Sequence, residues 1–272
     1  MSLFNKIKKA KAQGYYRTFE LFFCRLVPPW IFRYSKGDIY DFDFEKLKSV
    51  ADSLSPEASS SLIIKCLEGT TGFEKPNDDE RMRLRDFTYN CVPLESTAND
   101  LGYAIYDAHE PNKLLGGVWI ALDSFSEDNL GLEFQFGKNQ AWLYCAFVAP
   151  SARGRGVYKK LVSFVGRDLE QRGYSQLLAI IQPWNRISRL MHQKPSKGII
   201  GTLSSIRLFG WAWISHRGNL KVDKRLVTNV KTRPANISVG DLGYPLVANE
   251  NKKAASNRSS ISSGTSLKHP AT

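Results

Sequence analysis

Apolar residues in the middle of the chain recur at spacings typical of a mixed α/β fold. Alternation and short apolar runs predict strands, and three- and four-residue spacings predict helices between them. The predicted strands are 39–44, 101–106, 114–122, 133–136, 142–148, 176–181, 199–203 and 206–214. The predicted helices are 45–67 with a break at Ser55-Pro56, 78–87, 156–172 and 185–193, and the acidic stretch 123–130 is expected to be a loop. Because residues 142–181 run strand, helix, strand, we expect a parallel pair there.

The pattern at the N-terminal end predicts an amphipathic helix over residues 3–27. Tyr15, Phe19, Phe22 and Leu26 lie at helical spacing among lysines, and Pro28-Pro29 ends the helix. A cationic helix followed by aromatic residues is typical of an anchor on an anionic membrane surface, formed here by residues 1–34. The same apolar stripe also fits docking on the domain, and both alternatives stay open.

These patterns divide the chain into four parts. We expect a basic arm at 1–36, a main folded domain at 37–220, a C-terminal extension at 221–250 and a disordered Ser-rich tail at 251–272. Trp211 and Trp213 alternate as in a strand and are expected to lie in the core or in a cleft wall.

Composition narrows the function classes. The chain has 272 residues and a net charge of +12, distributed as +7 over 1–36, −11 over 37–150 and +8 over 151–200. A net positive charge suggests a nucleic-acid-binding module. Because the positive charge is confined to separate segments and no nucleic-acid-reading motif is present, we keep this function only as the weaker alternative. No apolar stretch reaches the length of about 20 residues that spans a bilayer. The four cysteines and four histidines show no disulfide or zinc spacing, which favours a cytoplasmic protein without a metal.

The most informative stretch connects the strand 142–148 to the helix that follows. It contains Arg153-Gly154-Arg155-Gly156-Val157-Tyr158, and more basic residues follow at once. Glycines allow close approach of the backbone to a ligand, and the first amides of a helix bind anions. A Gly/Arg loop at this place between strand and helix therefore predicts a phosphate site.

This loop resembles the acetyl-CoA motif of the GCN5-related N-acetyltransferase (GNAT) superfamily, Arg/Gln-x-x-Gly-x-Gly/Ala, with Tyr158 in place of the small last residue. Further along, Asn185, Ser188 and His192 resemble the second motif of the family. Lys194-Pro195-Ser196-Lys197 departs from the usual Lys-x-Gly-Phe continuation. The resemblance covers roughly residues 98–215.

The resemblance implies a mixed, mostly antiparallel sheet, splayed after its fourth strand and flanked by helices. The pantetheine arm of acetyl-CoA, or of another acyl-CoA, would pair with the backbone in the gap, and the pyrophosphate would bind the loop. Asn185 and Ser188 would lie near the pantetheine arm and the thioester. The implied pantetheine residues are Ala146, Phe147 and Val148, and the implied phosphate residues are Arg153, Gly154, Arg155, Gly156, Val157 and Tyr158.

The implied chemistry is attack of an amine on the thioester, which needs a base for the amine and an acid for the thiolate. His192 stands where the family often has a tyrosine acid, and Glu133 and Tyr144 are the candidate bases. The acidic half of the chain favours a cationic acceptor, a small-molecule or envelope-precursor amine, met in the cytoplasm or at the inner face of the membrane. A homologue that binds CoA without catalysis is the alternative; oligomeric state is left open.

Overall fold

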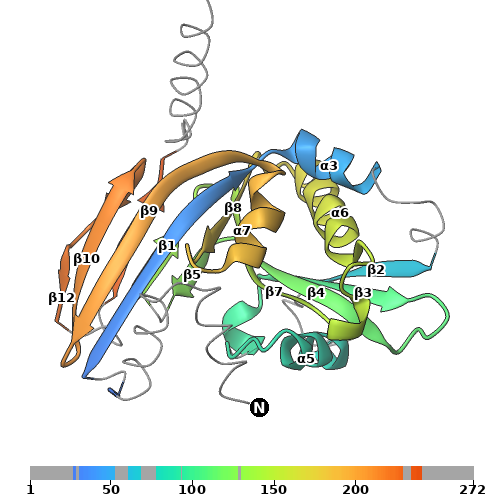
Figure 1. The fold of residues 1–272 in the computed structure, drawn as a ribbon, viewed down its shortest axis with the longest axis horizontal. Coiled ribbons are helices and arrows are strands. Elements are labelled where there is room, and N and C mark those ends of the chain that lie inside the picture. Colours follow the sequence, from blue (N-terminus) through green and yellow to red (C-terminus); the bar gives the residue numbers. More distant parts are fainter. Residues whose placement is uncertain are drawn as a thin grey trace, which may run out of the picture.

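The computed structural model describes residues 27–28, 31–52, 61–68, 78–92, 94–127, 130–228 and 234–240. The described strands form a large nine-stranded sheet and a smaller four-stranded sheet (Figure 1). The expected N-terminal helix, apart from Val27 at its end, and the Ser-rich tail lie outside the described residues.

The large sheet has the order β12-β10-β9-β1-β8-β7-β4-β3-β2. Its strands are β1 (Phe32–Phe42), β2 (Leu62–Leu67), β3 (Leu101–Asp107), β4 (Leu114–Ala121), β7 (Gln140–Val148), β8 (Gln176–Ile181), β9 (Ser196–Leu208), β10 (Trp211–Gly218) and β12 (Leu226–Val227). Neighbouring strands are antiparallel except β7 and β8, which are parallel as the strand-helix-strand pattern predicts. The mixed, mostly antiparallel sheet expected from the sequence is thus confirmed.

Helices and the small sheet cover the two faces of the large sheet. The helices are α3 (Phe44–Asp52), α5 (Asp78–Phe87), α6 (Val157–Gln171) and α7 (Arg186–Gln193). The small sheet contains β11 (Leu220–Val222), β13 (Ala235–Val239), β6 (Leu132–Gln135) and β5 (Ser124–Glu127), in that order. One hydrophobic core lies between the large sheet and α3 and α6; a second core includes the small sheet and Leu84 of α5.

Several expected elements differ. The predicted helix 45–67 is wrong in its second half, because Leu62–Leu67 pairs with β3 as an edge strand. The expected loop 123–130 contains β5, which pairs with β6. The turn between β9 and β10 falls at Phe209-Gly210, not between 203 and 206. In each case pairing with a distant strand decides the structure, and local pattern does not report it.

The expected segment boundaries also shift. β1 begins at Phe32, so the boundary after residue 36 falls inside a strand in the middle of the large sheet. The segment 221–250 is not peripheral over its described part, because Ala235, Ile237 and Val239 are buried in the second core. Trp211 and Trp213 are about half exposed, so their expected place in the core or in a cleft wall is wrong.

Candidate active site

The parallel strands β7 and β8 separate halfway along their length. Their described pairing runs from Gln140 to Trp142 on β7 and ends at Leu178 on β8. Beyond it, β7 stays paired with β4 on its other side up to Val148. A bulge lies in this half of β7, where Cys145 has a φ of 47°. The backbone of residues 146–148 therefore borders an opening between the two strands.

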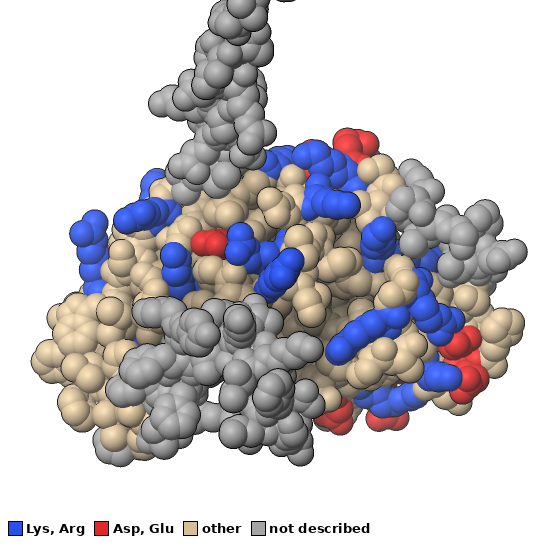
Figure 2. All heavy atoms as spheres, in the orientation of Figure 1, with Lys and Arg blue, Asp and Glu red and all other residues tan. Residues whose placement is uncertain are grey.

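The loop after β7 presents a helix N-terminus at this opening. Gly154 and Gly156 have φ of 80° and 75°, a conformation that favours glycine. Gly156 is the N-cap of α6 and supplies no side chain to bond the first amides, which leaves them for an anion. Arg153 donates from Nε to the carbonyl oxygen of Val148 at 3.2 Å and lies over the ring of Phe147. Lys and Arg side chains gather over the visible face that carries α6 and α7 (Figure 2).

A hydrogen bond between Tyr158 and His192 joins α6, which follows β7, to α7, which follows β8. The Tyr158 hydroxyl lies 2.5 Å from Nε2 of His192, and Nδ1 of His192 lies 2.6 Å from the carbonyl oxygen of Ser188. Because a carbonyl only accepts, Nδ1 carries the proton and Tyr158 donates to Nε2. Burial lowers the pKa of His192 and raises the pKa of Tyr158, so both groups are neutral near pH 7.

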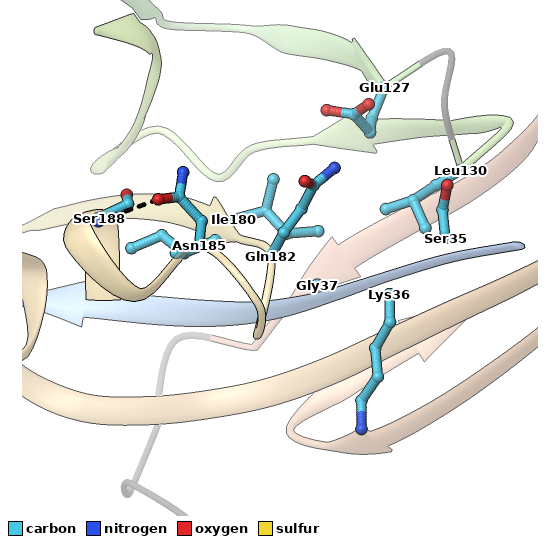
Figure 3. A pocket seen from close by; sticks show the side chains of 10 residues that line it. Ser35, Lys36, Gly37, Glu127, Leu130, Ile180, Gln182, Asn185 and Ser188 are labelled. Carbon is cyan, nitrogen blue, oxygen red and sulfur yellow. Dashed lines mark hydrogen bonds between the residues drawn. The ribbon is translucent and has the colours of Figure 1, made fainter. Parts of the chain in front are cut away.

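A pocket of about 210 Å³ lies at the end of β8, between β1, β5 and the start of α7. Asn185 caps α7, accepting at Oδ1 from the amide of Ser188 at 3.1 Å, and both residues line the pocket. Glu127 of β5 lines the pocket from the small sheet, and Gln182 from the end of β8. The side chain of Lys36 extends away from Glu127, on the other side of β1 (Figure 3).

A family model of the acetyltransferase (GNAT) family matches residues 67–196. This segment contains the separating strands, the glycine loop and α7. Over these residues, a little under half of the chain, the sequence is similar to the GNAT family. No curated protein matches the chain.

Solved structures give only distant likenesses. A conserved protein of unknown function from Staphylococcus epidermidis is 11% identical with a TM-score of 0.44, and the alignment covers 64% of this chain and 62% of that one. A GCN5-related N-acetyltransferase-like protein from Streptococcus suis is 15% identical with a TM-score of 0.42, covering 65% and 62%. AAC(6')-Iy, in complex with the bisubstrate analog CoA-S-monomethyl-acetylneamine, is 19% identical with a TM-score of 0.36, covering 48% and 87%. The chain thus spans about three fifths of the first two proteins.

Within the GNAT segment, the structure places the expected phosphate and pantetheine residues together. Ala146, Phe147 and Val148 border the opening, and residues 153–158 form the loop and the start of α6 at its end. Tyr158 turns its side chain toward His192, which explains how a bulky residue fits at the start of this helix. With Nδ1 donating to the carbonyl oxygen of Ser188, His192 accepts the Tyr158 hydroxyl at Nε2, which does not favour the role of acid expected for it.

The two expected bases do not reach the pocket. Glu133 alternates with the buried Leu132 and Phe134 on β6, so its side chain lies on the face of the small sheet turned away from the core. Tyr144 is buried and donates its hydroxyl to Oδ2 of Asp100 at 2.6 Å. Burial and the Asp100 carboxyl raise the pKa of Tyr144, which keeps it protonated. Neither residue fits the expected role.

Glu127, the carboxylate that lines the pocket, is absent from the predicted site because residues 124–127 show no strand pattern. Its pairing with Leu132 puts it on the inner face of the small sheet, one residue away from the outward Ser126–Glu133 pair. The Cys145 thiol is less suited to catalysis, since burial raises its pKa to about 11.

Among the described residues no cluster of His, Cys, Asp or Glu could hold a metal. No helix of the described part of the chain is long and apolar enough to cross a bilayer.

Proposed function

We propose that this protein transfers an acetyl or other acyl group from a CoA thioester to an amine. The observation that carries the proposal is the separation of β7 from β8 beside an uncapped helix N-terminus. A strand edge with unpaired backbone groups binds an extended amide-bearing arm as another strand would. The pantetheine arm has this chemistry, and the end of the β7–β8 pairing at Trp142 supports its binding along the rest of β7.

The loop fits the phosphates of the same molecule. Positive φ at Gly154 and Gly156 turns the backbone so that the first amides of α6 lie at the end of the opening. The space around Gly154 is open, so no neighbouring side chain blocks an approaching phosphate there. Arg155 is exposed beside it and supplies positive charge.

The residues around the opening have distinct roles in acyl transfer. A backbone amide of residues 146–148 donates to the thioester carbonyl oxygen as negative charge develops on it. The Tyr158 hydroxyl carries the proton that the departing sulfur needs, and His192 positions that hydroxyl through the bond to Nε2. The proposed acid is therefore Tyr158 of α6, whereas the resemblance implied His192 of α7.

The acceptor amine binds in the pocket on the side of the small sheet. The Glu127 carboxylate attracts an ammonium group and takes its proton, directly or through water, before attack. Asn185, Gln182 and Ser35 give the pocket hydrogen-bonding groups that suit a polar acceptor. The acceptor is thus a polar, cationic amine, and its identity is the next question.

Calorimetric titration with acetyl-CoA tests the proposal. In Gly154→Glu a carboxylate enters the phosphate loop, and we expect affinity to fall at least about tenfold through charge repulsion. Gly173→Glu is the matched control, because Gly173 also has positive φ with open space around it and lies at the other end of α6. The control keeps wild-type affinity although its backbone strain is similar.

Two results would contradict the proposal. Absence of acetyl-CoA binding by the wild type refutes it, as does equal affinity of the Gly154→Glu and Gly173→Glu variants. Tight binding without release of free CoA thiol across a panel of amines would instead identify a CoA-binding protein without transferase activity.

A further inference from the structure

An exposed apolar patch covers one end of the large sheet. Figure 1 shows that β9, β10 and β12 form this end. The side chains of the patch are between 39% and 67% exposed. We name this the aromatic patch, and it consists of Ile206, Leu208, Phe209, Trp211, Trp213 and Leu226. Large apolar side chains gathered in this way mark interaction surfaces.

Strand pairing arranges the patch in rows across the sheet. Trp211 lies opposite Leu208, and Trp213 lies between Ile206 and Leu226. The two indole rings are neighbours, with centroids 6.3 Å apart. Alternate residues of a strand share one face, so the patch is continuous on one side of the sheet.

Phe209 extends the patch at the turn in a conformation that is unfavourable for its side chain. It has a φ of 47° and precedes Gly210 in a two-residue turn, where Asn-Gly is the favoured pair. A bulky residue there costs stability, and 67% of this one is exposed, so it contributes little to the core. The hairpin has no structural need for an aromatic residue at its tip.

Basic and polar side chains follow the patch along the same face. The next row away from the turn contains Lys36, Ser204 and Ser215. The row beyond it contains Arg217, Thr202 and Asp38, whose carboxylate accepts from the Thr202 hydroxyl. Each row lies about 7 Å from the last, because two strand residues separate them. The apolar side chains thus lie nearest the turn, and cations follow one and two rows behind them. A protein surface that enters an anionic bilayer needs this order, with apolar groups deepest and cations at the level of the lipid phosphates.

The chain also enters the fold at the edge of the patch. Phe32, the first residue of β1, pairs with Leu208, and the amide of Phe209 donates to the carbonyl oxygen of Ile31. Residues 1–36 carry a net charge of +7. Of these residues, Lys36 lies within β1, one row from Ile206 and Trp213 on the same face.

We propose that the aromatic patch inserts into the headgroup region of an anionic bilayer, where Lys36 and Arg217 contact lipid phosphates. Indole and phenyl rings favour the interface between water and lipid, and positive charge complements an anionic leaflet. The proposal goes beyond acyl transfer and does not depend on it.

Flotation of the full chain with vesicles tests this proposal. We expect binding to phosphatidylcholine vesicles that contain phosphatidylglycerol, weaker binding without the anionic lipid, and further weakening by salt. Replacing both tryptophans, Trp211→Thr with Trp213→Thr, lowers the partition coefficient at least about tenfold because two rings no longer bury area in lipid. Phe209→Asn lowers it too, while it relieves the strained turn and keeps the hairpin.

The matched control is Tyr89→Asn, since Tyr89 is another exposed aromatic residue with positive φ, on a part of the fold distant in sequence from the patch. It keeps wild-type vesicle binding. Equal binding of the wild type and the double tryptophan variant overturns the proposal. So does a failure of the wild type to float, or a dimer in light scattering that the double variant converts to monomer without vesicle binding.

Discussion

Asp100 is a carboxyl whose burial makes the folded protein sensitive to pH. It lies just before β3, and it accepts a hydrogen bond from Tyr144. Burial is the largest influence and raises the pKa of Asp100 from 3.8 to about 6, against the opposing effects of the Tyr144 hydrogen bond and the Arg81 charge. The difference corresponds to about 3 kcal/mol between the two protonation states.

The sign of the effect follows from proton binding in the two states. Between about pH 4 and 6 the folded protein holds a proton on Asp100 that the unfolded chain releases. The contribution of this group to the free energy of unfolding therefore falls as the pH rises through that range, and the loss persists above it. At pH 8 the buried, charged carboxylate destabilises the fold by up to about 3 kcal/mol.

The substitution Asp100→Asn removes the charge and keeps an oxygen that accepts from Tyr144. We expect the variant to be more stable than the wild type at pH 8, by up to about 3 kcal/mol, and within about 1 kcal/mol of it at pH 4. Urea denaturation followed by tryptophan fluorescence at both pH values measures this difference. A stability difference between variant and wild type that is the same at pH 4 and pH 8 would refute the reasoning.

The other two predictions concern one catalytic and one structural residue. Tyr158→Phe lowers kcat roughly a hundredfold with unchanged affinity for acetyl-CoA, because it removes the proton donor; His192→Gln, which keeps an acceptor, loses less. Stopped-flow assay of free thiol checks this, and a wild-type kcat in Tyr158→Phe contradicts it. Arg81→Met lowers the free energy of unfolding by about 3 kcal/mol, because the buried guanidinium donates to the carbonyl oxygens of Leu67, Thr97 and Asp100. Urea denaturation measures that loss, and a change below about 1 kcal/mol contradicts it.

The elements that sequence predicts well are those whose pattern is long and local. The strand 176–181 and the helix 78–87 have the predicted bounds, and α6 differs by one residue at each end. The glycine loop was also predictable, because residues with positive φ and the first residue of a helix are recognised from the local sequence. These features depend on residues close together in the sequence.

The parts of the site that sequence missed depend on contacts between distant segments. Glu127 faces the pocket because β6 also pairs in parallel with β13, about a hundred residues later, which builds a second sheet. Tyr158 contacts His192 although 34 residues separate them in the sequence, because α6 and α7 follow the two strands that separate. The sequence pattern predicted only that Tyr158 belongs to the phosphate loop. Alternation identified Trp211 and Trp213 as strand residues, but it cannot tell which face meets the core.

The charge distribution gains a spatial meaning from these placements. The glycine loop and α7 belong to the segment 151–200, which carries +8, whereas Glu127 belongs to the segment 37–150, which carries −11. The acyl transfer proposed above needs positive charge at the phosphates and a carboxylate at the acceptor. A net charge of +12 is therefore compatible with an acidic acceptor pocket, because the excess of basic residues lies at the loop, at α7 and in the N-terminal arm.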